Sequence, residues 1–108
     1  MPFLELVAVP CQISRGGFSQ ELIFEFPLYD GQIHVGDAPR HYCWDTAGRT
    51  IDIDEPKPGR NMTGLVAARL LQKEGDRTLV SIPDGEVVHV NVAVLQPRPG
   101  EPARHVPV

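Results

Sequence analysis

The stretch HYCWD, residues 41–45, places four chemically versatile side chains next to one another. His41 and Cys43 provide an imidazole and a thiol, and Tyr42 and Trp44 provide aromatic rings. Imidazoles and thiols serve as metal ligands or catalytic groups, whereas exposed aromatic rings bind peptides and methylated amines. The chemistry open to this stretch depends on which of its side chains face the solvent.

A metal site built on His41 and Cys43 is one hypothesis. Residues two apart on a strand point to the same side, so this pair has a spacing that permits chelation. Cys11, His34 or His89 would have to complete a tetrahedral set. Structural zinc sites normally show two close ligand pairs, and the sequence has no CxxC motif and no second pair. We therefore expect no metal and no cofactor, and a small metal- or ligand-binding protein is the alternative function.

Catalysis is not indicated by the motifs. A nucleophile needs a base and an oxyanion hole in the correct geometry, and closeness in sequence does not align Cys43 with His41. No G-x-S-x-G motif is present, and the acidic run DIDE at 52–55 does not match the EF-hand calcium pattern. We expect a solvated acidic loop there and a protein that is not an enzyme.

Three aromatic residues form the candidate binding surface: Tyr29, Tyr42 and Trp44 lie in or beside predicted turns. Small β-barrels of the SH3 and Tudor type bind peptides with such clusters. Core packing is the competing interpretation, favoured for Trp44 because it is the only tryptophan. If HYCW is a strand, alternation prevents it from burying all four side chains. We expect the two aromatic rings to face the core and His41 and Cys43 to face out, because large rings contribute more burial.

The composition indicates one all-β domain. The chain has 108 residues, an ordinary length for one domain, and 42% of them are hydrophobic, a little under the globular average but too many to indicate disorder. Eleven prolines and ten glycines are too many for a helical bundle and favour short strands joined by tight turns.

The charge pattern narrows the choice of partners. Fourteen acidic residues against ten basic ones give a net charge of −4, and the basic residues are scattered, so neither nucleic acid nor anionic lipid is the expected partner. The longest apolar runs, such as VNVAVL at 90–95, are far shorter than the roughly 20 residues of a membrane span. The N-terminal apolar stretch lacks a preceding basic region, so we expect a cytoplasmic protein whose Cys11 and Cys43 are thiols.

Strands are predicted from alternating apolar residues between turn signals. Pro10 marks the first of them as an edge or bulged strand. The segment 64–73 fits a strand or a helix, and we favour a strand because a hairpin formed by 77–95 needs a third strand. This hairpin is expected to turn at Pro83–Glu86. The predicted strands lie at 3–14, 21–26, 33–35, 41–44, 64–73, 77–82 and 86–95.

Two hairpin turns resemble each other in sequence. LYDGQIHV at 28–35 and IPDGEVVHV at 82–90 share Asp-Gly and His-Val, and each follows an alternating strand. Asp-Gly hairpins converge on such patterns because Asp-Gly permits a positive φ. The alternative is a duplicated three-stranded unit whose two halves pack face to face.

The chain is predicted to form a single β domain over 1–96, with halves 1–49 and 64–96 joined by a loop at 50–63. The Pro-rich segment 97–108 is expected to be an extended tail that docks on the chain itself or on a partner, where Arg98, Arg104 and His105 would meet the acidic loop at 52–55. The competing interpretation is a frayed tail that touches nothing, as chain ends usually are.

The predicted fold is a small antiparallel barrel or sandwich of five to seven strands. Within residues 64–96, the stretch TLVSIPDGEVVHVNVAVL is similar to the hairpin-rich half of SH3-like barrels, and this resemblance places NVAVL at the short turn before the last strand. A resemblance of fold does not define a function. The expected function is a non-catalytic module that binds another protein or associates with itself, and the tail 97–108 is one route to such association.

Overall fold

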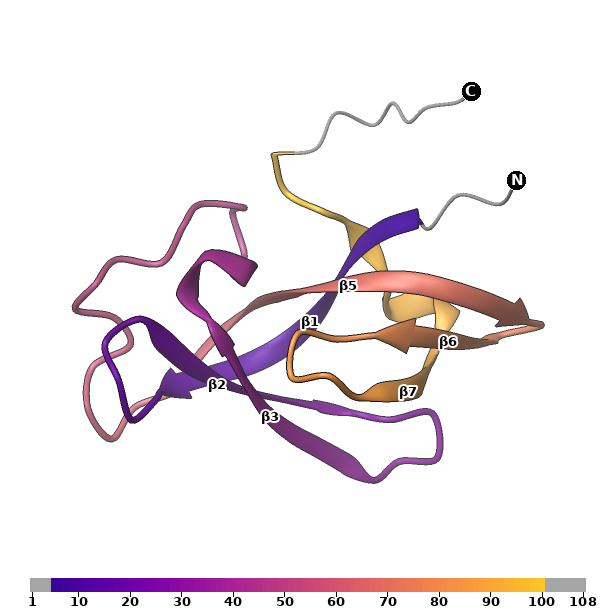
Figure 1. Cartoon of the computed structure of the whole chain (residues 1–108), viewed down its shortest axis with the longest axis horizontal. Coiled ribbons are helices and arrows are strands. Elements are labelled where there is room, and N and C mark those ends of the chain that lie inside the picture. Colours follow the sequence, from indigo (N-terminus) through magenta and orange to yellow (C-terminus); the bar gives the residue numbers. More distant parts are fainter. Residues whose placement is uncertain (1–4, 101–108) are drawn as a thin grey trace.

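The computed structural model describes residues 5–100, which form one eight-stranded antiparallel sheet (Figure 1). The all-β prediction is confirmed, and the sheet is open and curled into a half-barrel. No helix in residues 5–100 is long and apolar enough to cross a membrane. The elements are β1 (Glu5–Arg15), β2 (Glu21–Pro27), β3 (Ile33–Pro39), the 3₁₀ turn η1 (Arg40–Tyr42), β4 (Cys43–Asp45), β5 (Met62–Glu74), β6 (Arg77–Ser81), β7 (Val87–Asn91), the 3₁₀ turn η2 (Val92–Val94) and β8 (Gln96–Pro97).

The strand order is symmetric about the central pair β1–β5. The order β3-β2-β1-β5-β6-β7 consists of two three-stranded meanders joined at their first strands. In each meander a 3₁₀ turn and a short strand follow, and that short strand pairs with the first strand of the other meander: β4 with β5, and β8 with β1. The two meanders therefore have the same topology, and they are joined side by side in one sheet through β1 and β5.

The two Asp-Gly turns have the same hydrogen bonds. In the turn 28–32, Asp30 Oδ1 accepts the N–H two residues ahead at 3.0 Å, and in the turn 82–86, Asp84 Oδ1 does the same at 2.9 Å. The glycine after each aspartate has a positive φ, 91° and 90°. The structure contains the predicted hairpin with its turn at Pro83–Glu86, so this prediction is confirmed. It succeeded because the residues of the turn themselves determine the conformation of such a hairpin.

The long strand β5 resolves the ambiguity at 64–73 in favour of a strand. It pairs with β1 over nine residues, and its half-buried and buried positions pack into the core. The helix propensity of its residues is outweighed by the pairing of β5 with strands on both of its sides. The 3₁₀ turn Val92–Val94 occupies the predicted position before the last short strand.

The expectation that Pro10 marks an edge or bulged strand is wrong. β1 is central, and its register with β5 runs through the pair Pro10–Leu65 without a shift. On the other side of β1, the ladder with β2 begins at Gln12 and the ladder with β8 covers only Val7 and Ala8. Pro10 lies in the gap between these two ladders. No strand there needs a backbone N–H group from β1, so a proline, which lacks this group, is tolerated.

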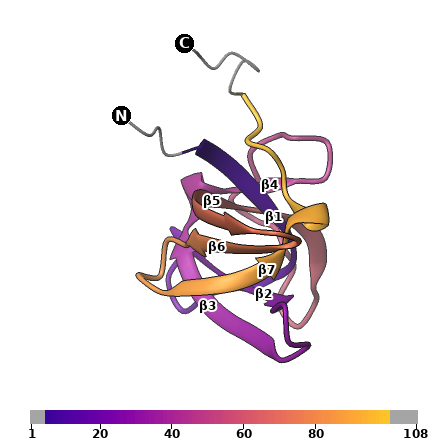
Figure 2. The ribbon, with the colours of Figure 1, turned by 90° about the vertical axis from the view of Figure 1, so that its right-hand side faces the viewer.

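The core lies inside the curl of the sheet. Phe24 and Phe26 are stacked with ring centroids 5.8 Å apart, and both are buried. Seen from the side, the sheet bends so that β3 and β7, at its two ends, approach each other (Figure 2). Two contacts bridge these ends: His34 Nε2 to Asp84 Oδ2 at 2.8 Å, and the Tyr29 N–H to the His89 carbonyl at 2.8 Å.

Residues 97–100 are the part of the predicted tail that the structure describes, and they lie on the chain itself. Pro97 pairs with Val7 of β1, and Arg98 Nη2 donates to the Ala68 carbonyl at 2.8 Å. The expected contacts of Arg104 and His105 fall outside the described residues.

Candidate interaction surface

The 3₁₀ turn η1 joins β3 to β4 and positions two different groups. It follows Pro39, and its first residue, Arg40, turns into the protein. Its last residue, Tyr42, faces the surface with 39% of its area exposed. A short turn thus carries a buried cation on one side and an aromatic ring on the other.

Arg40 is buried, with 8% exposure, and holds two loops together. Its Nε donates to the Ser19 carbonyl at 2.8 Å, and its Nη1 donates to the carbonyls of Asp52 and Glu55, both at 2.8 Å. A buried guanidinium needs such acceptors because leaving a charge unsolvated is costly. The loop 16–20 and the loop 50–61 therefore form one end of the molecule.

Arg15 fixes the same loop from the side of β1. Its Nη2 donates to the Asp54 carbonyl at 2.9 Å and its Nε donates to the Pro56 carbonyl at 3.0 Å. Because the arginines bind main-chain carbonyls, the carboxylates of Asp52 and Asp54 remain exposed. The side chains of the acidic run are thus solvated, as predicted. The contacts of its main chain with Arg15 and Arg40 were not predicted, because these arginines lie 12 to 41 residues away from the carbonyls that they bind.

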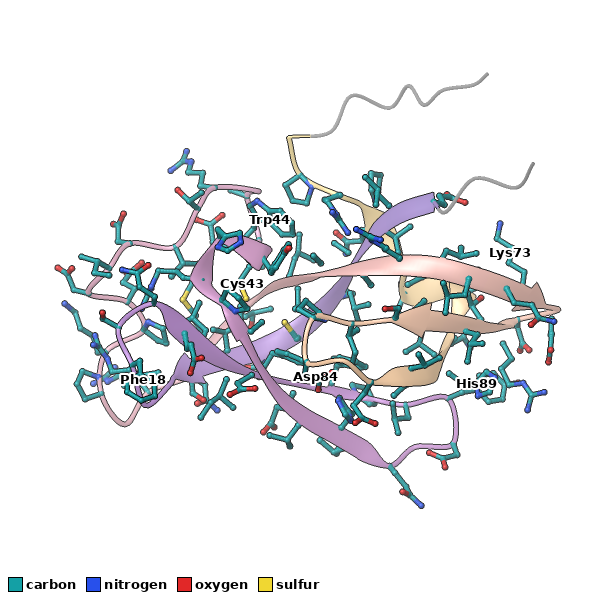
Figure 3. The ribbon with its side chains drawn as sticks, viewed as in Figure 1. Phe18, Cys43, Trp44, Lys73, Asp84 and His89 are labelled. Atoms are coloured by element: carbon teal, nitrogen blue, oxygen red, sulfur yellow. The ribbon has the colours of Figure 1, made fainter. Side chains whose placement is uncertain are left out.

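The predicted orientation of HYCWD is wrong. Alternation was expected along a strand at 41–44, but the strand β4 begins only at Cys43, after the 3₁₀ turn. Cys43 is fully buried, whereas Tyr42 is exposed and Trp44 is half-buried. Cys43 and Trp44 both lie on β4 (Figure 3). The backbone register of β4 with β5 places Cys43 beside Val66 in the core, so burial follows the pairing and not the size of the side chain.

The close pairing of β4 with β5 depends on Gly64. The position of a Cβ at residue 64 is occupied by the Trp44 carbonyl, and the Ile13 side chain lies beside it. Any side chain there would push β4 away from β5. Glycine is required because of this close approach of two backbones.

Both cysteines are free and buried. Burial raises the pKa of Cys43 to about 12, although the nearby Arg40 charge acts in the opposite direction. Burial, reinforced by the neighbouring Cys43, also raises the pKa of the Cys11 thiol. Neither thiol is a nucleophile at neutral pH, because the reactive form is the thiolate.

The metal-ligand pair His41 and Cys43 is not formed. His41 is exposed and packs against Tyr42, with ring centroids 4.4 Å apart and ring planes tilted by 39°, whereas Cys43 is enclosed in the core. Among the potential completing ligands, His34 is paired with Asp84. Within residues 5–100, no three side chains of His, Cys, Asp or Glu are grouped in a way that could hold a metal ion.

The Tyr42 hollow is an open depression of about 220 Å³ where η1, β5 and the end of β6 meet. Its lining residues include the buried Ala68 and Ile82, the exposed Arg69 and the half-buried Ser81. The hollow is lined by Tyr42, Ala67, Ala68, Arg69, Ser81, Ile82, Pro83 and Arg98. The hollow thus brings one aromatic ring and two polar side chains from three different segments together on one surface.

The three predicted aromatic residues do not form one surface. Tyr29 lies on the β2–β3 turn, where its hydroxyl donates to Asp76 Oδ1 at 2.9 Å, and this bond raises its pKa. Trp44 is on β4, and only Tyr42 lines the hollow. The residues that sequence reasoning missed, Arg69 and Ser81, come from strands distant in sequence from Tyr42, so no local spacing could have linked them to it.

Comparison with known proteins adds no relative: no family model, no curated protein and no solved structure matches this chain.

Proposed function

We propose that this protein is a non-catalytic interaction module that binds an extended polypeptide segment in the Tyr42 hollow. The single observation that carries the proposal is that Tyr42, 39% exposed, lines an open hollow together with the buried Ala68 and Ile82. An aromatic ring beside an apolar depression is how many β domains recognise extended, proline-containing peptides.

Two polar residues that line the hollow indicate which side chains the bound peptide should carry. Arg69 is exposed, and a guanidinium can bind a carboxylate in a bidentate geometry. The Ser81 hydroxyl offers a further donor. The proposed ligand is therefore an extended segment with a proline or aliphatic residue for the Tyr42 ring and an acidic residue for Arg69.

The non-catalytic part of the proposal is supported by the two cysteines. Both are buried with raised pKa values and do not act as nucleophiles at neutral pH.

The test is an NMR titration of the full chain with three synthetic octapeptides. The peptides are identical and proline-containing except for a Glu, Gln or Lys at one end. We expect the amide signals of Tyr42, Arg69 and Ser81 to shift, with the Glu peptide binding most tightly and losing affinity in high salt. Tyr42→Ala should weaken binding roughly tenfold, a typical effect for a central aromatic contact. The matched control is Tyr29→Ala, which removes an exposed tyrosine outside the hollow. Shifts with no preference for the Glu peptide, or no shift with any of the three, would refute the proposal.

A further inference from the structure

Arg98 brings the C-terminal part of the chain to the Tyr42 hollow. It follows β8 directly, and β8 pairs with β1 on the edge opposite β5. Arg98 Nη2 nevertheless donates to the Ala68 carbonyl of β5 at 2.8 Å. The Arg98 side chain therefore crosses β1, and it lines the hollow together with Ala68. The residues that follow Arg98 thus begin beside the site proposed for peptides.

The chain turns immediately after Arg98, at Pro99 and Gly100. Gly100 has a φ of 79°, and a proline followed by a glycine with positive φ is the pattern of a type II turn. Pro99 packs on the body of the protein, since a Cβ at Gly48 would lie 3.3 Å from it. The first and fourth residues of a β-turn have Cα atoms less than about 7 Å apart. The turn therefore directs residue 101 back toward Arg98.

The sheet register defines a short path from this turn to the hollow. Leu6 is paired with Arg69, and Arg69 with Ser81. Directly opposed residues of antiparallel strands have their side chains on one face, so Leu6, 37% exposed, lies on the face that carries Arg69 and Ser81. Neighbouring strands are about 4.8 Å apart, so β8 and β5 are separated by about 10 Å across β1. About three extended residues, at about 3.3 Å each, cover this distance.

The segment 101–108, EPARHVPV, begins with the two residue types that we expect in a ligand of the hollow. Glu101 is the acidic residue and Pro102 is the proline. The charged residues that line the hollow, Arg69 and Arg98, are both cations. The charge of Glu101 is therefore complementary to the hollow.

We propose that residues 101–108 are an internal ligand of the Tyr42 hollow and compete there with peptides from other proteins. Glu101 pairs with Arg69, and Pro102 packs on the Tyr42 ring. This inference rests on the proposed function of the hollow and adds its regulation, because a partner must displace the segment before it binds.

Covalent linkage makes even a weak internal ligand effective. A ligand on a short linker has an effective concentration of about 1 mM at its site. With an internal dissociation constant of about 0.1 mM, roughly one hollow in ten is free, and an added peptide binds about tenfold more weakly. The expected effect of the segment is therefore a tenfold change in apparent affinity.

Amide NMR signals of the full chain test where the segment lies. The comparison is a variant in which 101–108 are replaced by a Gly-Ser segment of the same length, which keeps the turn and the Arg98 contact. The hollow signals, those of Tyr42, Arg69 and Ser81, should differ between the two proteins. Glu101→Gln in the full chain should move them toward their positions in the replaced variant.

Glu25→Gln is the matched control for the loss of a carboxylate. Glu25 is exposed on β2, outside the lining of the hollow, so this variant should leave the hollow signals unchanged. Hollow signals that are the same with and without the native segment would overturn the proposal, as would changes confined to the acidic loop at 52–55. Signals that vary with protein concentration would assign the segment to a second copy and would also overturn it.

Titration with the Glu octapeptide separates this inference from the proposed function. The replaced variant should bind the peptide about tenfold more tightly than the full chain does. Equal affinities would overturn the internal ligand and leave the peptide site standing. A replaced variant that binds none of the three octapeptides would refute the peptide site itself, and the competition with it.

Discussion

The imidazole Nε2 of His34 lies 2.8 Å from Asp84 Oδ2, across a separation of 50 residues. The pair connects β3, at one end of the curled sheet, to the β6–β7 turn near the other end. The side chains are 16% and 10% exposed. This contact holds the half-barrel closed on one side, while the Tyr29 N–H bond to the His89 carbonyl holds it at a second point.

Asp84→Ala should destabilise the protein by about 1–3 kcal/mol, because it removes a part-buried hydrogen bond to His34 as well as a turn bond. Asp30→Ala is the matched control, since it removes only the equivalent bond of the other Asp-Gly turn. Urea unfolding of both variants measures the difference. Equal losses for the two variants would show that the His34 contact contributes nothing to stability.

Arg40→Ala should cost about 2–4 kcal/mol, because three carbonyls that bind the guanidinium lose a charged donor. The loop 50–61 should also open locally, which exposes the bond after Arg60 to trypsin. Arg49→Ala, at an exposed position before this loop, serves as the control and should change stability by less than about 0.5 kcal/mol. Unchanged cleavage after Arg60 in the Arg40 variant would contradict the role of Arg40 in holding the loop.

Gly64→Ala should destabilise the protein by more than about 3 kcal/mol or prevent folding, because the new Cβ collides with the Trp44 carbonyl, a main-chain atom that cannot turn aside. Gly17→Ala is the control, since no atom lies within 4 Å of the corresponding Cβ. Thermal unfolding by circular dichroism compares the two. A Gly64→Ala protein as stable as Gly17→Ala would mean that β4 does not pair with β5 as described.

The cysteines predict how stability varies at high pH. The folded-state pKa of Cys43, about 12, lies above its ordinary value of 9.0, so the folded protein binds this proton more tightly than the unfolded chain does. The contribution of Cys43 to stability is therefore complete below pH 9 and decreases as the pH rises from 9 toward 12. Cys11, whose pKa is also raised, acts in the same direction.

Urea unfolding between pH 7 and 11 measures this decrease, and Cys43→Ser together with Cys11→Ser should flatten it. At pH 8 neither native thiol should react with Ellman's reagent, whereas both should react in urea. Rapid labelling of the native protein would show that the thiols are not enclosed in the core.

Deleting residues 97–108 should lower the melting temperature by about 4–8 °C, which corresponds to roughly 1 kcal/mol for a domain of this size. The deletion removes the pairing of Pro97 with Val7 and the bond from Arg98 to the Ala68 carbonyl. A variant that ends at Gly100 keeps both contacts and is the reference. If the two truncated variants melt at the same temperature, residues 97–100 contribute nothing to stability. A role of the tail in association would then require that the truncation also changes the molar mass in solution.

The sequence by itself determined the hairpins. Asp30-Gly31 and Asp84-Gly85 form the expected turns because a positive φ at glycine and an aspartate bond to the backbone are local properties. The sequence also sufficed to predict a strand at 64–73, because the hairpin that follows it needs a third strand to be stable.

Only the tertiary structure decided which residues of HYCWD are buried and which groups surround them. Cys43 enters the core because β4 starts there and pairs with β5, and Pro10 sits in a central strand because two neighbouring ladders leave a gap beside it. Arg40 and the Tyr42 hollow are assembled from segments far apart along the chain. Such contacts depend on strand order and close approach, which the spacing of residues within a single segment does not encode.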